Sequence, residues 1–293
     1  MTTPTRERSK TSVKSGNLSA VKTAYLSLAL LLATCLSAAA QQTMPDDSVA
    51  RPARAYKDPE LVLDPKLPTL FIIGDSTARV DNDGGWGDHI EHYFDLTKIN
   101  IANRARAGRS SRTFITEGAW DLALARMKAG DYVLIQMGHN DGGELTGSRP
   151  RGTLKGTGDE TQDVTLADGS KETVHTFGWY IRKYIVDTRT KGATPILLSL
   201  TIRNIWTDGH IERDMGYDGY IRQIAEAEKV AFVDMATVAA DGFEKLGQAE
   251  TAKYFPVDHT HTSAAGAELN AQSVVEALKR AKSPLVEYIQ AEQ

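Results

Sequence analysis

Short apolar runs recur along the chain and alternate with longer segments of helical periodicity. An apolar run of four to eight residues that ends at Gly, Asp or Asn is typical of a buried strand. The predicted strands cover residues 69–73, 98–102, 132–137, 195–200 and 231–234. The predicted helices cover residues 87–96, 113–129, 176–191, 217–229 and 264–282. This alternation predicts an α/β fold with right-handed β–α–β units and a parallel sheet covered by helices on both faces.

The segment 142–174 interrupts this alternation. It is rich in glycine, threonine and charged residues and follows the third predicted strand directly. A loop of this length in a compact domain is usually functional or disordered. Because it leaves the carboxyl end of a strand, we expect it to form one wall of a cleft there.

The first forty residues resemble a targeting segment. A basic start is followed by an apolar run over 24–36 and by Ala38-Ala39-Ala40, which predicts a secretory signal peptide over residues 1–40. An uncleaved membrane anchor is the alternative, but the run is shorter than the roughly 20 residues of a spanning helix. We therefore expect a secreted or periplasmic protein with no membrane contact after cleavage.

The remaining chain divides into a polar, proline-bearing linker over residues 41–66, a globular domain over 67–283 and a C-terminal tail over 284–293. Cys35 is the only cysteine and lies within the apolar run, so the mature chain would have no disulfide. Lipid attachment at Cys35 is a minority alternative, because Thr34 stands where lipoprotein signals usually carry a small residue.

Composition narrows the class of protein further. The chain has 293 residues, of which 41% are hydrophobic and 25% charged, which suits one large domain with its own core. The formal net charge is −4. Binding to nucleic acid depends on neutralising phosphates with basic residues, so nucleic acid is not an expected partner.

Two distant segments carry the residue types of a serine nucleophile with its base and acid. The first predicted strand ends at Gly74-Asp75-Ser76, and Asp258 and His261 lie just before the last predicted helix. A serine hydroxyl needs an imidazole to remove its proton, and a carboxylate fixes the tautomer of that imidazole. The sequence therefore predicts Ser76, His261 and Asp258 in these three roles.

Two further segments could supply hydrogen bonds to an oxyanion. Gly108 follows the second predicted strand, where its amide could approach a substrate closely, and Asn140 follows the third strand with a side-chain amide. The three residues of the predicted triad also have structural alternatives: Ser76 as a turn or helix-cap residue, Asp258 as a helix-capping acid and His261 as a loop histidine. His259 and His261 could also suggest a metal, but no further cluster of ligands is visible, so no metal or other cofactor is expected.

Together these segments resemble the blocks of the SGNH, or GDSL-type, hydrolase superfamily. The four matching segments, in order, are Gly74-Asp75-Ser76, Gly108, Gly138-His139-Asn140-Asp141 and Asp258-His259-Thr260-His261. The resemblance implies a three-layer, flavodoxin-like fold with five parallel strands. It also implies a catalytic triad of Ser76, His261 and Asp258, and an oxyanion hole formed by the amides of Ser76 and Gly108 and the side chain of Asn140.

Within this superfamily the chain is most similar to the rhamnogalacturonan acetylesterases over residues 67–282. The similarity rests on residues 74–78, 148–154, 174–180 and 258–263. The absence of disulfides favours the bacterial branch of that family. The resemblance implies a secreted serine esterase that removes O-acetyl groups from a plant polysaccharide, most specifically the rhamnogalacturonan backbone of pectin.

Several alternatives remain open from the sequence. An acetylxylan esterase or another carbohydrate acetylesterase would carry the same blocks, and a binding module for polysaccharide could keep the fold without turnover. An α/β-hydrolase is disfavoured because Ala78 replaces the second glycine of its Gly-x-Ser-x-Gly elbow. Arg203, Asn204 and Trp206 follow the fourth predicted strand and are candidates for sugar binding.

Overall fold

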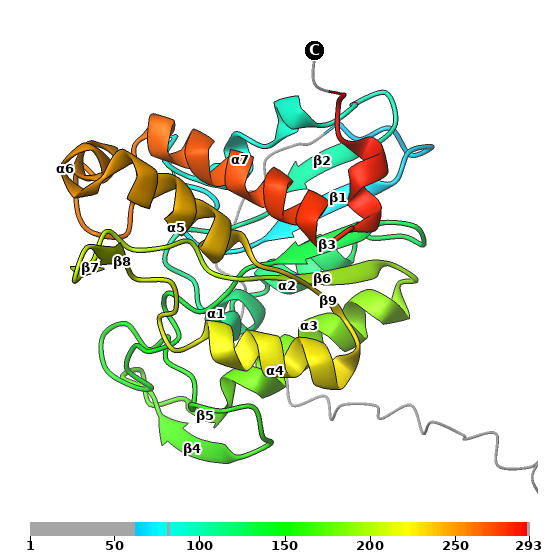
Figure 1. Ribbon diagram of the computed structural model, residues 1–293. Coiled ribbons are helices and arrows are strands. Elements are labelled where there is room, and N and C mark those ends of the chain that lie inside the picture. The colour runs from blue at the N-terminus through cyan, green and yellow to red at the C-terminus, as the bar shows by residue number, and fades with distance from the viewer. Residues whose placement is uncertain (1–61, 81–82, 292–293) are drawn as a thin grey trace, which may run out of the picture. The chain divides into compact units, whose positions relative to one another are not determined.

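The central sheet of the protein has five parallel strands in the order β2–β1–β3–β6–β9 (Figure 1). The structure is a computed structural model that describes residues 62–80 and 83–291, all of them in the compact unit 46–293. The predicted signal peptide, Cys35 and most of the predicted linker lie outside the described residues. The strands of the sheet are β1 Thr69–Ile73, β2 Asn100–Asn103, β3 Tyr132–Ile135, β6 Thr194–Leu198 and β9 Ala231–Val233.

The sheet order confirms the predicted flavodoxin-like fold. Numbered along the sheet's own strands, the order is 2-1-3-4-5, so the chain reverses direction across the sheet beside β1. β1 is paired on both sides, with Leu70 in register with Ile101 of β2 and Tyr132 of β3. All five residues of β1 are buried. The carboxyl ends of β1, β2 and β3 therefore meet at one edge, where the polar segments of the sequence begin.

Helices cover both faces of this sheet and make three layers (Figure 1). On β1, Leu70 and Ile72 join the core beneath α5 and α7, whereas Phe71 and Ile73 join the core beneath α1 to α4. This split follows from the period of two in a strand. The helices are α1 Ser111–Thr116, α2 Ala119–Leu124, α3 Phe177–Thr190, α4 Asp218–Glu228, α5 Met235–Leu246, α6 Gln248–Thr251 and α7 Ala264–Arg280.

Two predicted helices differ in the structure. Residues 87–96 form the short 3₁₀ turns η1 Trp86–Asp88 and η2 Glu91–Tyr93. The amides of Trp86 and Gly87 donate to carbonyls of residues 77 and 78, which holds this segment to the loop after β1. The predicted helix 113–129 is broken into α1 and α2 at Gly118, whose φ of 78° is left-handed.

Helix α5 was not among the predicted helices. The Asp234 side chain caps it by accepting a hydrogen bond from the Thr237 amide at 3.1 Å. Its buried face carries Ala236, Ala239 and Phe243 against the sheet. Helix α5 lies beside α7 in the layer that covers this face of the sheet, and β9 is the edge strand of the sheet.

The long segment 142–174 is ordered around a hairpin of β4 Thr161–Thr165 and β5 Lys171–His175. A second, smaller hairpin pairs β7 Trp206–Thr207 with β8 His210–Ile211. Arg112 on α1 is 1% exposed and binds Glu172 of β5 through Nε and Nη2, at 2.7 and 2.9 Å. Its Nη1 also donates to the Gly152 carbonyl at 2.8 Å. One buried arginine thus fastens the long segment to the helix that follows β2.

Residues 284–293, which the sequence assigns to a tail, fold onto the domain in their described part. The 3₁₀ turn η4 Pro284–Tyr288 buries Leu285 completely, and Ile289 forms an antiparallel bridge with Phe94. An apolar residue held this way stabilises the fold by burial. The folded domain therefore continues beyond residue 283.

Asp218 gives a prediction for the pH dependence of stability. It is 4% exposed at the start of α4, and its Oδ1 accepts a hydrogen bond from the Leu200 amide at 2.7 Å. Burial raises the pKa of Asp218 to about 7, against about 3.9 in an unfolded chain. The contribution of Asp218 to the free energy of unfolding is therefore fully present below about pH 4, and it is lost as the pH rises through about 7.

Asp218→Asn keeps the acceptor for Leu200 but cannot ionise. We expect the melting temperature of this variant, relative to the parent, to rise by roughly 4 °C or more between about pH 4.5 and about pH 8. Thermal melts followed by circular dichroism measure it, with the exposed Asp163→Asn as a matched control. A difference that stays constant with pH would contradict the buried, protonated state of Asp218.

Candidate active site

Ser76 lies at the carboxyl end of β1 in a tight turn. The turn requires a glycine before it, because a Cβ on Gly74 would lie 3.0 Å from the Ala78 Cβ and 3.3 Å from the Gln136 carbonyl oxygen. The Asp75 side chain is fully buried, and its Oδ1 accepts hydrogen bonds from the amide and hydroxyl of Thr77, each at 2.9 Å. Asp75 thus stabilises the turn from inside, and Ser76 is left 9% exposed.

A chain of hydrogen bonds links Ser76 to the segment before α7. The Ser76 Oγ lies 2.9 Å from His261 Nε2, and His261 Nδ1 lies 2.8 Å from Asp258 Oδ2. A carboxylate only accepts hydrogen bonds, so Nδ1 carries the proton and Nε2 is the acceptor for the serine hydroxyl. The structure therefore brings together all three residues predicted as nucleophile, base and acid.

The loop at Asp258 is built to hold a charged carboxylate. Partial burial would raise its pKa, but hydrogen bonds from the His261 amide and side chain and from the Thr260 amide outweigh it and lower the pKa to about 2. The two amides donate to Asp258 Oδ1 at 2.8 and 2.7 Å, which leaves Oδ2 for the imidazole. The carboxylate is therefore ionised at neutral pH and positioned by its own backbone.

The loop after β2 lies directly beside the serine turn. The Arg106 amide donates to the Gly74 carbonyl at 3.0 Å, and Gly108 follows with a left-handed φ of 78°. A residue with a Cβ is strained in this conformation. Among the described residues, none accepts a hydrogen bond from the amides of Ser76 or Gly108. Both donors are available to a ligand.

Asn140 follows β3 and contacts this same loop. Its side chain is 8% exposed and uses Nδ2 to donate to the Arg109 carbonyl at 2.8 Å. Since an amide nitrogen carries two hydrogens, the second one is left to serve as an oxyanion donor. The structure therefore places the three predicted oxyanion residues, Ser76, Gly108 and Asn140, on adjoining turns at one sheet edge.

Asp141 positions the turn that carries these donors, and sequence reasoning assigned it no role. It is fully buried and accepts hydrogen bonds from the amide and hydroxyl of Ser111, the first residue of α1. Burial raises the pKa of Asp141 to about 7, because these hydrogen bonds only partly offset the lost hydration. It connects the loop after β3 to the helix after β2.

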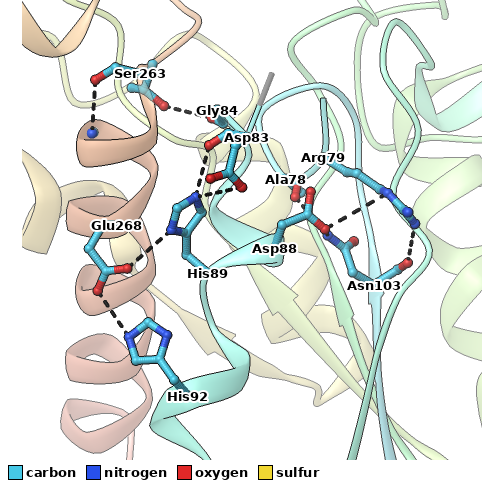
Figure 2. A network of polar contacts seen from close by, with 12 residues as sticks. Ala78, Arg79, Asp83, Gly84, Asp88, His89, His92, Asn103, Ser263 and Glu268 are labelled. Atoms are coloured by element: carbon cyan, nitrogen blue, oxygen red, sulfur yellow. Dashed lines mark hydrogen bonds and ion pairs between the residues drawn. The ribbon is translucent and has the colours of Figure 1, made fainter. Parts of the chain in front are cut away.

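A polar network fixes the segment after the serine turn against α7 (Figure 2). His89 points between Asp83 and Glu268, with Nε2 donating to the Asp83 carbonyl at 2.9 Å and Nδ1 3.3 Å from Glu268 Oε2. His92 lies 3.3 Å from the other oxygen of Glu268. The Thr262 hydroxyl, next to His261, donates to the Gly84 carbonyl at 2.9 Å. The network therefore couples the positions of the segment near Ser76 and the helix that begins after His261.

The three candidate sugar-binding residues lie beside the histidine loop. The Asn204 amide donates to the His259 carbonyl at 2.7 Å, and Trp206 Nε1 donates to Asn204 Oδ1 at 2.8 Å. Trp206 is half-buried against the core, and the buried Arg203 Nε has no partner among the described residues. Their position agrees with a role beside the site, whereas their contact with a sugar stays a prediction.

His139 is the remaining imidazole near this edge. It is half-buried, with Nε2 2.9 Å from the Thr201 hydroxyl, and desolvation of the ring lowers its pKa to about 4. A neutral ring of this kind is suited to packing and orienting Asn140.

Within residues 62–80 and 83–291, no group of three or more His, Cys, Asp or Glu side chains could hold a metal, and no helix there has the length and apolarity to cross a bilayer.

The oxyanion assignment makes a direct prediction for Asn140→Ala. Loss of one preorganised donor should lower kcat by about 10²- to 10³-fold, with little change in KM. Steady-state hydrolysis of an aryl acetate measures both constants. Asn100→Ala is a matched control, because that asparagine donates to the Asp64 carbonyl at the opposite end of β2. A change in KM alone would reassign Asn140 to substrate binding.

Comparison with known proteins identifies relatives of this chain. The model of the GDSL-like lipase/acylhydrolase family matches residues 72–269. The rhamnogalacturonan acetylesterase of Emericella nidulans is 36% identical over 211 residues, which are 72% of this chain and 84% of the relative. The "Probable rhamnogalacturonan acetylesterase YesY" of Bacillus subtilis is 29% identical over 230 residues, 75% of this chain and 96% of the relative.

A solved structure supports the same fold. The crystal structure of protein YxiM from Bacillus subtilis superposes with a TM-score of 0.59 at 25% identity. The match covers 74% of this chain, and this chain spans 58% of that structure. The matching family is the GDSL type implied by the sequence blocks, not the α/β-hydrolase alternative.

Proposed function

The chain belongs to the GDSL-like lipase/acylhydrolase family and is a carboxylic-ester hydrolase, and we propose that it removes O-acetyl groups from plant cell-wall polysaccharide. The most specific substrate that we propose is the rhamnogalacturonan backbone of pectin. The observation that carries the proposal is the hydrogen-bonded series Ser76, His261, Asp258, with distances of 2.9 and 2.8 Å at the carboxyl edge of the sheet.

In the proposed mechanism, the Ser76 Oγ attacks the acetyl carbonyl carbon while His261 Nε2 takes the hydroxyl proton. The carbonyl oxygen becomes an oxyanion that accepts hydrogen bonds from the amides of Ser76 and Gly108 and from Asn140. His261 then gives its proton to the sugar oxygen, which leaves as a hydroxyl group. Throughout, Asp258 stabilises the positive charge that develops on the imidazole.

The second half of the reaction frees the enzyme. Water attacks the acetyl group on Ser76 as His261 accepts a proton from it, and the same oxyanion donors stabilise the new tetrahedral intermediate. Collapse of that intermediate returns the proton to the serine oxygen and releases acetate. The triad needs no cofactor for either step.

Two names among the relatives support the choice of substrate. The Emericella nidulans protein, at 36% identity, and the Bacillus subtilis protein, at 29%, are both named for rhamnogalacturonan. Acetylated xylan or another acetylated glycan is the alternative within the same chemistry. The basic start and the apolar run over 24–36 support a secreted or periplasmic location, where such a polymer would be met.

The proposal is tested by acetate release from acetylated rhamnogalacturonan and, in parallel, from acetylated xylan, using the chain from Gln41 onward. Release from rhamnogalacturonan at the higher kcat/KM is the expected result. Release from xylan alone would keep the esterase and change its substrate. Release from neither polymer, with hydrolysis of an aryl acetate, would exclude both as substrates.

A further inference from the structure

Two arginines of the long segment 142–174, Arg149 and Arg151, approach the loop after β2 that carries Gly108. A Cβ built on Gly108 would lie 3.3 Å from Arg149 Nη2 and 4.0 Å from Arg151 Nη1, so both guanidinium groups approach one point directly beside this glycine. Arg151 Nη1 also lies 3.4 Å from the Gly108 carbonyl, to which it donates. Neither the sequence blocks nor the triad accounts for this pair of charges.

Within the described residues these arginines differ from Arg109 and Arg112 in having no acidic partner. Arg109 is paired with Glu117 at 2.7 Å and Arg112 with Glu172 at 2.7 Å. In the part of the chain that the structure describes, no carboxylate forms an ion pair with Arg149 or Arg151. Two like charges held close together repel each other, and an anion placed between them would relieve this repulsion.

The backbone that carries the pair is firmly held. The amides of Arg151 and Gly152 donate to the Glu144 carbonyl at 3.0 and 2.8 Å, and the Thr153 amide donates to the Asp141 carbonyl at 2.9 Å. Gly152 is required here, because its Cβ would lie 2.0 Å from the Gly143 carbonyl oxygen. Arg149 is exposed and Arg151 half-buried, so the guanidinium groups are accessible from a rigid turn.

The environment of Arg151 agrees with a site that awaits a negative charge. Burial and the charge of Arg149 lower the pKa of Arg151. Asp75 and Asp141 act in the opposite direction from inside the fold, but both are fully buried and already accept hydrogen bonds from Thr77 and Ser111. These acids do not neutralise the exposed side of the pair.

We propose that Arg149 and Arg151 form a subsite for the carboxylate of a uronate residue next to the acetylated sugar. A guanidinium group matches a carboxylate with two parallel hydrogen bonds, whereas a neutral sugar offers no charge. The subsite adjoins Gly108, so a bound uronate would lie beside one of the proposed oxyanion donors. This inference rests on the proposed function and specifies how a pectic backbone is distinguished from a neutral one.

The test uses inhibition of aryl acetate hydrolysis, so that it does not require the polymer to be a substrate. A short oligogalacturonate and its methyl ester are compared as competitive inhibitors at constant ionic strength. The parent should bind the free acid more tightly than the ester. Arg149→Gln and Arg151→Gln, made singly, should each raise the inhibition constant of the acid roughly 10- to 100-fold, because each variant loses hydrogen bonds to a charged group. The inhibition constant of the ester should stay nearly unchanged in both variants.

Arg280→Gln is the matched control, because it removes one exposed positive charge from the end of α7. It should change the inhibition constant by no more than about twofold. Equal inhibition by acid and ester, or inhibition that neither arginine variant weakens, would overturn the subsite. If acetylated rhamnogalacturonan proved not to be a substrate while the arginine effect persisted, the proposed polymer would fail and the subsite would stand.

Discussion

Ser76→Ala should reduce kcat for aryl acetate and for acetylated polysaccharide by a factor on the order of 10⁶. In the proposed mechanism the hydroxyl oxygen forms and breaks the acyl bond, and no other hydroxyl is hydrogen-bonded to His261 among the described residues. The proposed oxyanion donors remain in the variant, so a small residual rate above the uncatalysed one is expected. Initial rates over a wide range of enzyme concentration measure the loss.

The fold of this variant should persist, since the one hydrogen bond of the Ser76 side chain to other described residues is that to His261. A circular dichroism spectrum and melting temperature close to those of the parent would show this. Ser170→Ala, in the turn of the β4–β5 hairpin, is the matched control, because its exposed hydroxyl donates to Asp168 of the same turn and lies away from the triad. Hydrolysis by Ser76→Ala at the parent rate would show that the nucleophile lies elsewhere.

Asp258→Asn should lower kcat by about 10⁴-fold with little effect on KM. An asparagine can still accept the amides of Thr260 and His261 through its oxygen, so the turn is retained. Its NH₂ group would then face His261 Nδ1 and donate to it. The imidazole proton would move to Nε2, the atom that must accept the proton from Ser76.

The pKa of Asp258 is about 2, so the effect of this substitution on kcat can be distinguished from an effect of protonating the carboxylate. The carboxylate is charged at every pH above about 3, so its own protonation cannot account for a change in rate near neutral pH. Asp168→Asn, in the hairpin turn, is the control for loss of one exposed negative charge. A loss of less than about tenfold in Asp258→Asn would show that His261 is oriented mainly by other contacts.

The central strands β1, β3 and β6 were predictable because they are largely buried on both faces. The predicted bounds 69–73 coincide with β1, where an uninterrupted apolar run fixes the strand. The pattern of residues 87–96 predicted a helix, whereas the structure has 3₁₀ turns there, because the amides of Trp86 and Gly87 donate to the loop after β1, a contact that periodicity does not register. Helix α5 escaped prediction because Gly242 weakens its pattern, whereas burial of an alanine face stabilises it.

The hairpin within 142–174 did leave a signal in the sequence. Strand β4 begins and ends with threonine, β5 contains Thr173 and Val174, and the two are joined through Asp168-Gly169, a combination that favours a tight turn. Gly169 has a left-handed φ of 83°, as such a turn requires. The charges of the surrounding segment outweighed this short pattern, so the whole stretch was predicted as a loop.

The triad was predictable for a different reason. Ser76 ends a strongly patterned strand, and the spacing of Asp258 and His261 lets one turn carry both side chains. The position of Arg149 and Arg151 was not predictable in this way. Their approach to Gly108 depends on how a glycine-rich turn folds back over residues forty positions earlier, and no periodicity encodes such a contact.

The central claim is that His261 and Asp258 make Ser76 an activated nucleophile. Its most direct test is reaction of the parent with a fluorophosphonate, a probe that modifies activated serines, followed by peptide mapping. The account predicts that esterase activity is lost in step with the attachment of one probe molecule per chain, at Ser76, and that Asp258→Asn reacts much more slowly. Attachment at another residue, or full activity with no attachment at Ser76, would contradict it.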